Sequence, residues 1–209
     1  MKVPPRPPVV TRAAWGADES LGLNADGRER WPLADWPLQI LVVHHTAWPE
    51  PVGPPADAVS RIHRLHAAER GWGDIGYGYL IAADGTIYEG RSTTRSRPAH
   101  TPAGAHVRDH NAGSLGIALL GGFATSEPAP AAREALVAIM AFEAARANID
   151  PTGTTVYVNP VTGRGAFVPI IAAHRDLAPT ECPGDALNRL LPEIRLATSV
   201  AVRSPSAPA

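Results

Sequence analysis

The sequence predicts a single α/β domain in which helices flank a central mixed β-sheet. Short apolar runs, typical of buried strands, alternate along the chain with longer segments in which apolar residues recur at helical spacing. The chain has 209 residues, of which 44% are hydrophobic and 19% are charged. This length and balance are typical of one folded domain with a substantial core.

Apolar runs indicate where the strands lie. The run at 39–45 is almost continuously apolar, which indicates a strand buried on both faces. A second strand at 75–82 leads through Asp84 and Gly85, a hairpin turn signal, into a strand at 86–89. Further strands are expected at 114–120, at 154–158 and 165–168 as a second hairpin, and at 167–172.

Helical spacing of apolar residues predicts three helices. The segment 57–70 carries an apolar stripe, and Gly71 is a natural stop after it. The stripe consists of Val59, Ile62, Leu65 and Ala68. The longest helix is expected at 130–148, and a closing helix at 185–196.

The remaining segments have the composition of loops and termini. The domain is expected to span 11–197, between a Pro-rich extended arm at 1–10 and a loose Ser/Ala/Pro-rich tail at 198–209. Residues 11–38 are rich in turn formers, and their tryptophans are expected to anchor them to the core; these are Trp15, Trp31 and Trp36. Residues 91–111 lack periodicity and are predicted to form a long surface loop.

Composition excludes several functional classes. A formal net charge of −1 argues against a nucleic-acid-binding protein, which normally has a basic face. The sequence contains no apolar run long enough to span a bilayer, and residues 1–5 lack the apolar core of a signal peptide. A single cysteine excludes an intramolecular disulfide, and we expect a monomer.

Histidines and the single cysteine could together bind one metal ion. His174 follows the apolar run at 167–172, Cys182 lies in the loop after it, and His44 and His45 end the run at 39–45. Imidazole and thiolate are ligands that zinc accepts, and catalytic zinc sites commonly use three protein ligands. Alternatively, strand-end histidines are ordinary polar residues and a lone cysteine is a small buried apolar residue. Spacing alone leaves both interpretations open.

Four ordered motifs carry a resemblance to a known family. They are VVHHTA (42–47), GWGDIGYGYLIAADGTIYEGR (71–91), GAHVRDHNAGSLGIALLGG (104–122) and AHRDLAPTECPG (173–184), preceded by TRAAWGADES (11–20). Together they resemble the type 2 N-acetylmuramoyl-L-alanine amidases, which include peptidoglycan recognition proteins and amidase-type phage lysozymes. The resemblance covers roughly residues 10 to 197 and implies the same mixed-sheet fold.

The resemblance implies a zinc cofactor and its ligands. It assigns the metal to His44, His174 and Cys182, and because strand neighbours point to opposite faces, His45 should point away from it. Tyr77 matches a tyrosine that hydrogen-bonds near the metal, although a strand tyrosine is often a core residue. Thr180 stands where phage members carry a lysine and many recognition proteins a threonine.

Other positions bear on the reaction indirectly. Ala118 occupies a position where some relatives place a glutamate, so no carboxylate base is available there. Asp176 could orient a metal ligand or pair with an arginine. Asn111 and Ser114 are expected to brace their loop.

The resemblance also implies a substrate groove. His106 matches a residue that lines it, and Gly71, Trp72 and Arg91 match recognition proteins that prefer stems with meso-diaminopimelate. Glycine would leave room, tryptophan would form an apolar wall, and arginine would pair with the extra carboxylate. Alternatively, Gly71 only ends a helix, Trp72 is a core residue and Arg91 is a solvated charge.

The resulting hypothesis is an enzyme that hydrolyses the amide bond between N-acetylmuramic acid and L-alanine in peptidoglycan, acting on cell walls. Two alternatives are a module that binds peptidoglycan without cutting it, and a protein with a structural zinc. Non-cutting relatives usually lack the cysteine ligand, which favours the enzyme. A structural zinc would need a fourth protein ligand.

Overall fold

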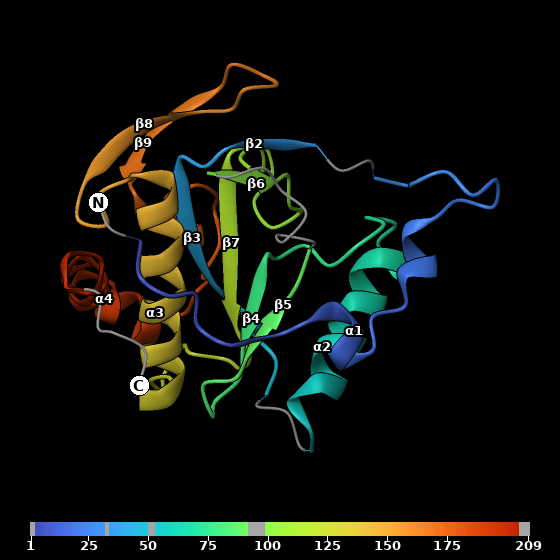
Figure 1. The fold of residues 1–209 in the computed structure, drawn as a ribbon, viewed down its shortest axis with the longest axis horizontal. Helices are drawn as coiled ribbons and strands as arrows, with labels where there is room; N and C mark the ends of the chain where they lie inside the picture. The colour runs from blue at the N-terminus through green and yellow to red at the C-terminus, as the bar shows by residue number, and fades with distance from the viewer. Residues whose placement is uncertain (1–2, 32–33, 50–52, 92–98, 205–209) are drawn as a thin grey trace.

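A six-stranded sheet forms the centre of the computed structural model, which describes residues 3–31, 34–49, 53–91 and 99–204 (Figure 1). Its strand order is β1-β5-β4-β7-β3-β10. The strands are β1 (Val9–Val10), β3 (Ile40–His45), β4 (Tyr79–Ile81), β5 (Ile87–Glu89), β7 (Ser114–Leu119) and β10 (Ile171–Ala173). Only β4 and β5 pair in antiparallel fashion among these strands of the described chain, so the expected mixed sheet is confirmed.

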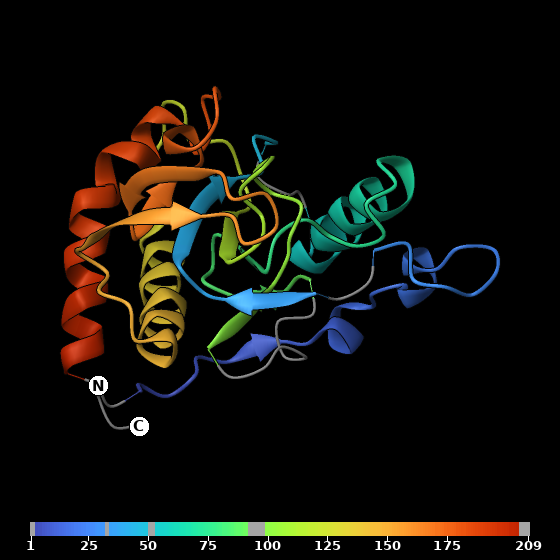
Figure 2. The same ribbon diagram turned by 90° about the horizontal axis from the view of Figure 1, so that it is seen from above.

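Helices cover both faces of this sheet. The long helices α3 (Pro130–Ala147) and α4 (Asp185–Arg203) pack on one face, while α1 (Arg12–Trp15) and α2 (Pro55–Arg64) lie on the other (Figures 1 and 2). The sheet is buried on both sides, which explains why its central strands are continuously apolar.

The second helix changes its geometry halfway. The segment predicted as one helix at 57–70 consists of α2 followed by a π-helical turn, η2 (Leu65–Glu69). Gly71 then adopts a left-handed φ of 69°, a conformation that glycine tolerates without steric cost. π-helical turns widen a helix locally and often lie at functional sites. This turn carries His66, which is described with the site below.

Two small sheets and two short turns complete the fold. The hairpin of β8 (Thr154–Val158) and β9 (Gly165–Pro169) confirms the second hairpin predicted from the sequence and extends from one end of the molecule (Figure 1). Strand β2 (Asp35–Pro37) pairs with β6 (His100–Pro102). The 3₁₀ turns are η1 (Glu19–Gly22) and η4 (His174–Asp176).

Predictions for the two termini need correction. The arm at 1–10 is not separate from the domain, because Val9 and Val10 pair with β5 as an edge strand; residues 1–2 lie outside the described part. The tail does not begin at 198, since α4 continues to Arg203. Thr198 and Val202 extend the buried stripe of this helix, and the Thr198 hydroxyl donates to the Ile194 carbonyl over 2.7 Å. Residues 205–209 lie outside the described part.

Two internal predictions also need correction. The segment at 91–111 is not simply a surface loop, because its described part contains β6 and the buried Thr101 and Val107; residues 92–98 are not described. The run at 167–172 is not one buried strand: Phe167 belongs to the outer hairpin, with 74% of its surface exposed, and β10 begins only at Ile171.

The predicted anchoring by tryptophans is confirmed for Trp15, and Trp36 is half-buried in β2, where it pairs with Thr101 of β6. Trp15 is buried, and its indole N–H donates to the carbonyl of Glu89 over 2.7 Å, whereas Trp31 is 42% exposed. No helix in the described ranges is both long and apolar enough to cross a membrane.

Candidate metal centre and cleft

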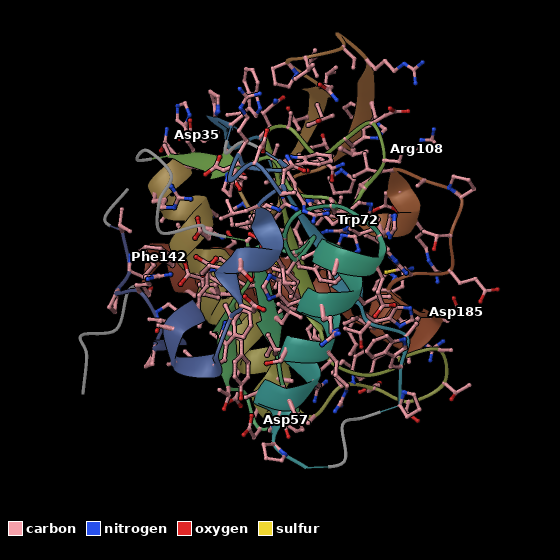
Figure 3. All side chains as sticks on the ribbon, turned by 90° about the vertical axis from the view of Figure 1, so that its right-hand side faces the viewer. Asp35, Asp57, Trp72, Arg108, Phe142 and Asp185 are labelled. Atoms are coloured by element: carbon pink, nitrogen blue, oxygen red, sulfur yellow. The ribbon has the colours of Figure 1, made fainter. Side chains whose placement is uncertain are left out.

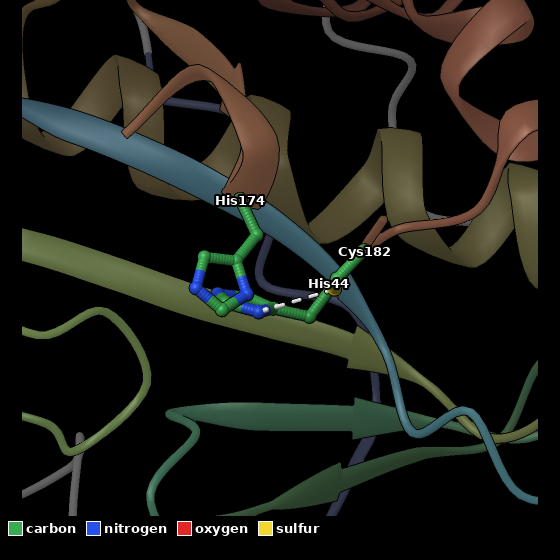
Figure 4. Close-up of side chains that lie close together, drawn as sticks. All are labelled: His44, His174 and Cys182. Atoms are coloured by element: carbon green, nitrogen blue, oxygen red, sulfur yellow. Dashed lines mark hydrogen bonds between the residues drawn. The ribbon is translucent and has the colours of Figure 1, made fainter. Parts of the chain in front are cut away.

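Three potential metal ligands converge at one edge of the main sheet. His44 lies near the end of β3, and His174 directly follows β10, which runs parallel beside β3. Adjacent parallel strands bring their carboxyl ends to the same edge, and the loop before α4 adds Cys182. One ligand atom from each residue lies within 4.8 Å of the others (Figure 4). The Cys182 Sγ atom lies 3.6 Å from Nδ1 of His44.

Strand alternation separates the two adjacent histidines. His44 continues the face of β3 that carries Ile40 and Val42, so its ring points to the converging ligands. His45 points to the opposite face, where its Nδ1 accepts the Phe123 N–H over 3.2 Å. The backbone N–H of His45 nevertheless donates to the Cys182 sulfur over 3.4 Å, so His45 contributes to the centre through its main chain.

Burial controls the protonation of these groups. It holds the pKa of His44 well below 6.5, with the neighbouring His106, His174 and His45 acting in the same direction. Burial likewise lowers the pKa of His174 to about 4. It raises the pKa of the Cys182 thiol to about 11, although the His45 N–H acts in the opposite direction. His44 and His174 are therefore both neutral at pH 7, the form that metal binding would require.

Tyr77 lies against the candidate metal centre. Its ring centroid is 5.2 Å from that of His44, and it lines a cleft that also contains His174 and Cys182. Burial, followed by the proximity of Cys182, raises the pKa of the Tyr77 hydroxyl. The phenol therefore stays protonated at neutral pH and can donate a hydrogen bond into the cleft.

The cleft has a volume of about 790 Å³ and opens beside His174 and Cys182. Thr180 also lines it, is exposed, and accepts the backbone N–H of Cys182 through its hydroxyl oxygen over 3.2 Å. The other lining residues are His45, Ala47, Gly122, Ala124, Thr125, Arg175, Glu181, Gly184 and Asp185.

His106 lies behind His44. Its Nδ1 atom is 3.1 Å from Nε2 of His44, and only 7% of the residue is exposed. Burial lowers the pKa of His106 to about 3, so this ring is also neutral. The predicted contact between His106 and substrate remains a prediction. In the structure, His106 contacts His44, a potential metal ligand.

A row of aromatic rings continues from the candidate centre through Tyr77 and the buried His66 to Trp72. Beyond Tyr77 lies His66, at a centroid distance of 5.6 Å, and then Trp72, at 4.8 Å from His66. Trp72 follows the end of the α2–η2 helix (Figure 3), and the Arg70 guanidinium lies over its ring at 4.9 Å. His66 is not among the site residues predicted from the sequence. The feature that points to it is a histidine in the last turn of the helix that precedes the GWGDIGY motif.

Arg91 is placed differently from the other predicted substrate contacts. It is buried, and its guanidinium donates to the carbonyls of Ile75, Trp72 and Asp74 over 3.0 to 3.2 Å. It lines a separate pocket of about 280 Å³ that also contains Trp31. Within the described ranges, Gly71, Trp72 and Arg91 are not among the residues that line the cleft at the metal centre.

The remaining predicted positions act through the backbone. Asp176 neither binds a ligand side chain nor forms a short ion pair in the described structure; it accepts the Ala173 N–H over 2.8 Å and so fixes the turn that carries His174. Asn111 braces its loop as expected, because its Oδ1 accepts the N–H groups of His106 and Val107. Ala118 pairs in register with His44, so this strand position presents a methyl group.

Comparison with known proteins identifies the family of this chain. A family model described as N-acetylmuramoyl-L-alanine amidase (Amidase_2) matches residues 35–185. The human N-acetylmuramoyl-L-alanine amidase is 33% identical over 192 residues, which cover 88% of this chain but only 28% of the human protein.

Solved structures show the same fold. Peptidoglycan recognition protein SD of Drosophila superposes with a TM-score of 0.66 at 27% identity, covering 88% of this chain and 92% of that chain. The amidase LysC of Clostridium intestinale superposes with a TM-score of 0.62 at 25% identity, covering 91% of this chain and 96% of that chain. The chain therefore belongs to the N-acetylmuramoyl-L-alanine amidase family, whose relatives include peptidoglycan recognition proteins.

Proposed function

We propose that this protein is a zinc-dependent amidase that hydrolyses the bond between the lactyl group of N-acetylmuramic acid and L-alanine in peptidoglycan. The observation that carries the proposal is the convergence of His44, His174 and Cys182 at the edge of a cleft that also contains Tyr77. Such an enzyme would act on cell walls, and we propose that it acts as a monomer.

The donor set fits zinc. Two neutral imidazoles and one thiol that can ionise match the nitrogen and sulfur ligands that zinc prefers. When bound, zinc would polarise the amide carbonyl and make water a stronger nucleophile near neutral pH. Three protein ligands beside an open cleft support a catalytic role, because a closed structural site would need a fourth ligand.

Tyr77 and Thr180 are proposed to stabilise the developing negative charge on the carbonyl oxygen. The Tyr77 hydroxyl stays protonated because burial raises its pKa. A donor held in place in a partly desolvated cleft stabilises a transition state more than a mobile donor does. The Thr180 hydroxyl adds a second donor without positive charge, so its contribution should be smaller than that of a lysine.

We also propose a preference for stems that contain meso-diaminopimelate. Arg91 is the cation proposed to pair with the extra carboxylate, beside an apolar wall at Trp72 and the open space at Gly71. The described contacts use the N–H groups on Nε and Nη2, and in the described part of the chain Nη1 has no acceptor. Nη1 is therefore the group proposed to meet the substrate.

The alternative is a module that binds peptidoglycan without cutting it. Digestion of purified cell walls distinguishes the two, because an amidase releases new L-alanine amino termini and a binding module does not. Zinc content, measured on the same protein by atomic emission, should be one per chain. Zinc binding together with cell-wall binding but no new amino termini would contradict the proposed reaction.

A further inference from the structure

The imidazole of His106 contacts His44 on the side away from the cleft. Nε2 of His44 lies 3.1 Å from Nδ1 of His106, and the two rings are nearly perpendicular at 85°. Both residues are buried, so water cannot replace this contact. The other nitrogen of His44, Nδ1, faces Cys182 and the remaining ligands.

A chain of hydrogen bonds fixes the direction of this contact. The carbonyl of His110 can only accept, so the Ser114 hydroxyl donates its proton there. The Ser114 hydroxyl and carbonyl oxygens then serve as acceptors for Nε2 of His106, at 3.3 and 3.4 Å. With its proton on Nε2, neutral His106 presents an unprotonated Nδ1, which accepts a proton from Nε2 of His44. His44 is thereby left with a free lone pair on Nδ1.

The surrounding backbone is shaped to hold His106 in this position. A Cβ atom at Gly116 would lie 2.5 Å from Cγ of His106, and one at Gly104 would lie 2.6 Å from its Cδ2. These distances are impossible for real atoms, so both glycines are needed for the ring to approach His44. Asn111 also accepts the backbone N–H groups of His106 and Val107, at 2.8 and 3.0 Å.

We infer that His106 is a positioning residue that holds His44 in the tautomer whose Nδ1 can bind a metal. This role differs from the substrate contact expected from the resemblance, and it rests on the proposed function only in taking the metal to be zinc. A neutral imidazole exists in two tautomers, and an outer partner that selects one raises metal affinity. Removing such partners typically weakens metal binding by about 10- to 100-fold.

Two amide substitutions test the position of the accepting atom. His106→Asn places its Oδ1 near the position of the imidazole Nδ1, whereas His106→Gln places its polar atoms farther along the side chain, near Nε2. The affinity for zinc is measured by competition with a chromophoric chelator, and folding is checked by circular dichroism and thermal unfolding. We expect zinc affinity within about 3-fold of the unmodified protein for the asparagine variant, and a loss of about 10- to 100-fold for the glutamine variant. Equal affinities in the two variants, whether both normal or both reduced, would overturn the inference.

The unmodified protein provides a test that does not depend on how the variants fold. Nitrogen-15 NMR of the zinc-loaded protein assigns the proton on each histidine ring. We expect protons on Nε2 of His44 and Nε2 of His106; a proton on Nδ1 of His106 would refute the assignment. Cell-wall digestion separates this inference from the proposed function, since an inactive protein that binds zinc with the expected tautomers would contradict only the reaction.

Discussion

The sulfur atom of Cys182 lies 3.6 Å from Nδ1 of His44, although 138 positions separate the two residues. The backbone N–H of His45 donates to the same sulfur over 3.4 Å. The end of β3 therefore contacts Cys182 through both a side chain and the main chain. Cys182 therefore connects β3, the first long strand of the sheet, to the loop that precedes the last helix, α4.

Replacing Cys182 with serine should abolish hydrolysis and weaken zinc retention, because a neutral hydroxyl replaces a soft thiolate. Zinc content after dialysis and the release of new amino termini from cell walls measure the two effects. Glu193→Gln is the control, since its side chain is exposed on α4 and is not among the residues that line the cleft. Near-normal turnover of the serine variant with zinc still bound would contradict the ligand assignment.

Replacing Tyr77 with phenylalanine should keep one zinc per chain and lower the turnover number by about 10²-fold, the scale associated with loss of one transition-state donor. The Tyr77 ring still packs beside His44 in this variant, so folding should be retained. Tyr88→Phe, in β5, controls for loss of a hydroxyl elsewhere. Unchanged activity in Tyr77→Phe would show that this tyrosine only fills space.

The proposed substrate preference can be measured directly. Muropeptides with meso-diaminopimelate should be cut faster than those with lysine. Arg91→Val should bring the kcat/KM values for the two muropeptides closer together. This variant should also be less stable, because three carbonyls lose their donor and each unsatisfied buried acceptor costs about 1–3 kcal/mol.

Arg91→Lys is the control for this experiment, because it keeps the charge without the planar fork. The proposed preference is tested by the ratio of kcat/KM for the diaminopimelate muropeptide to kcat/KM for the lysine muropeptide, measured on the unmodified protein. Equal rates on both muropeptides would contradict the proposal whatever the variants do.

Zinc uptake should release about one proton per ion at pH 6, below the pKa of about 7 expected for a zinc-bound water. Burial raises the pKa of the Cys182 thiol to about 11 and lowers that of His174 to about 4, so before metal binding the thiol holds a proton and the imidazole does not. The apparent affinity should therefore rise about tenfold per pH unit between about pH 5.5 and 6.5. Calorimetry in buffers of different ionisation enthalpy counts the protons, and Cys182→Ser should release none.

The stability of the protein should depend on Asp74 in a pH-dependent way. Burial acts to raise the pKa of this carboxyl, but the hydrogen bond with His63 and the charge of Arg12, 2.9 Å away, outweigh it and lower the pKa below 3.8. Because the pKa of Asp74 is lower in the folded state, its ionised form stabilises the fold above the unfolded pKa of about 4. This stabilisation is lost as the pH falls below that value and through the lower pKa of the folded state.

Asp74→Asn should accordingly reduce the free energy of unfolding by about 1–3 kcal/mol at pH 7, and by much less at pH 3. Urea denaturation at the two pH values measures the difference. Asp26→Asn is the control, because Asp26 is 57% exposed and its partner Arg28 lies 3.7 Å away, a surface pair worth about 0–1 kcal/mol. An equal loss at both pH values would mean that the ionised form of Asp74 is not what stabilises the fold.

The sequence alone determined most of the secondary structure and the family. Strand β3, helix α3 and the β8–β9 hairpin lie close to their predicted positions, because each depends on a local pattern of apolar residues or turn formers. The motifs around His44, Tyr77 and Cys182 were also visible, since the residues of each motif are adjacent in the chain.

Other features depended on tertiary contacts. Helix α4 extends to Arg203 because Thr198 and Val202 find a buried surface to pack on, which their Ser/Ala-rich surroundings did not indicate. The buried state of Arg91 likewise depends on three carbonyls that the fold brings to it from residues 72–75.

The environment of His44 likewise has one part that the local sequence predicted and one part that depends on tertiary contacts. Its position at a strand end, with its side chain on the opposite face from that of His45, followed from the alternation of side chains in a β-strand. Its contact with His106 did not, because Gly104 and Gly116 create the necessary space only after β7 has paired with β3. Local sequence specifies which groups are available, whereas hydrogen-bond partners and pKa values depend on distances that exist only in the folded chain.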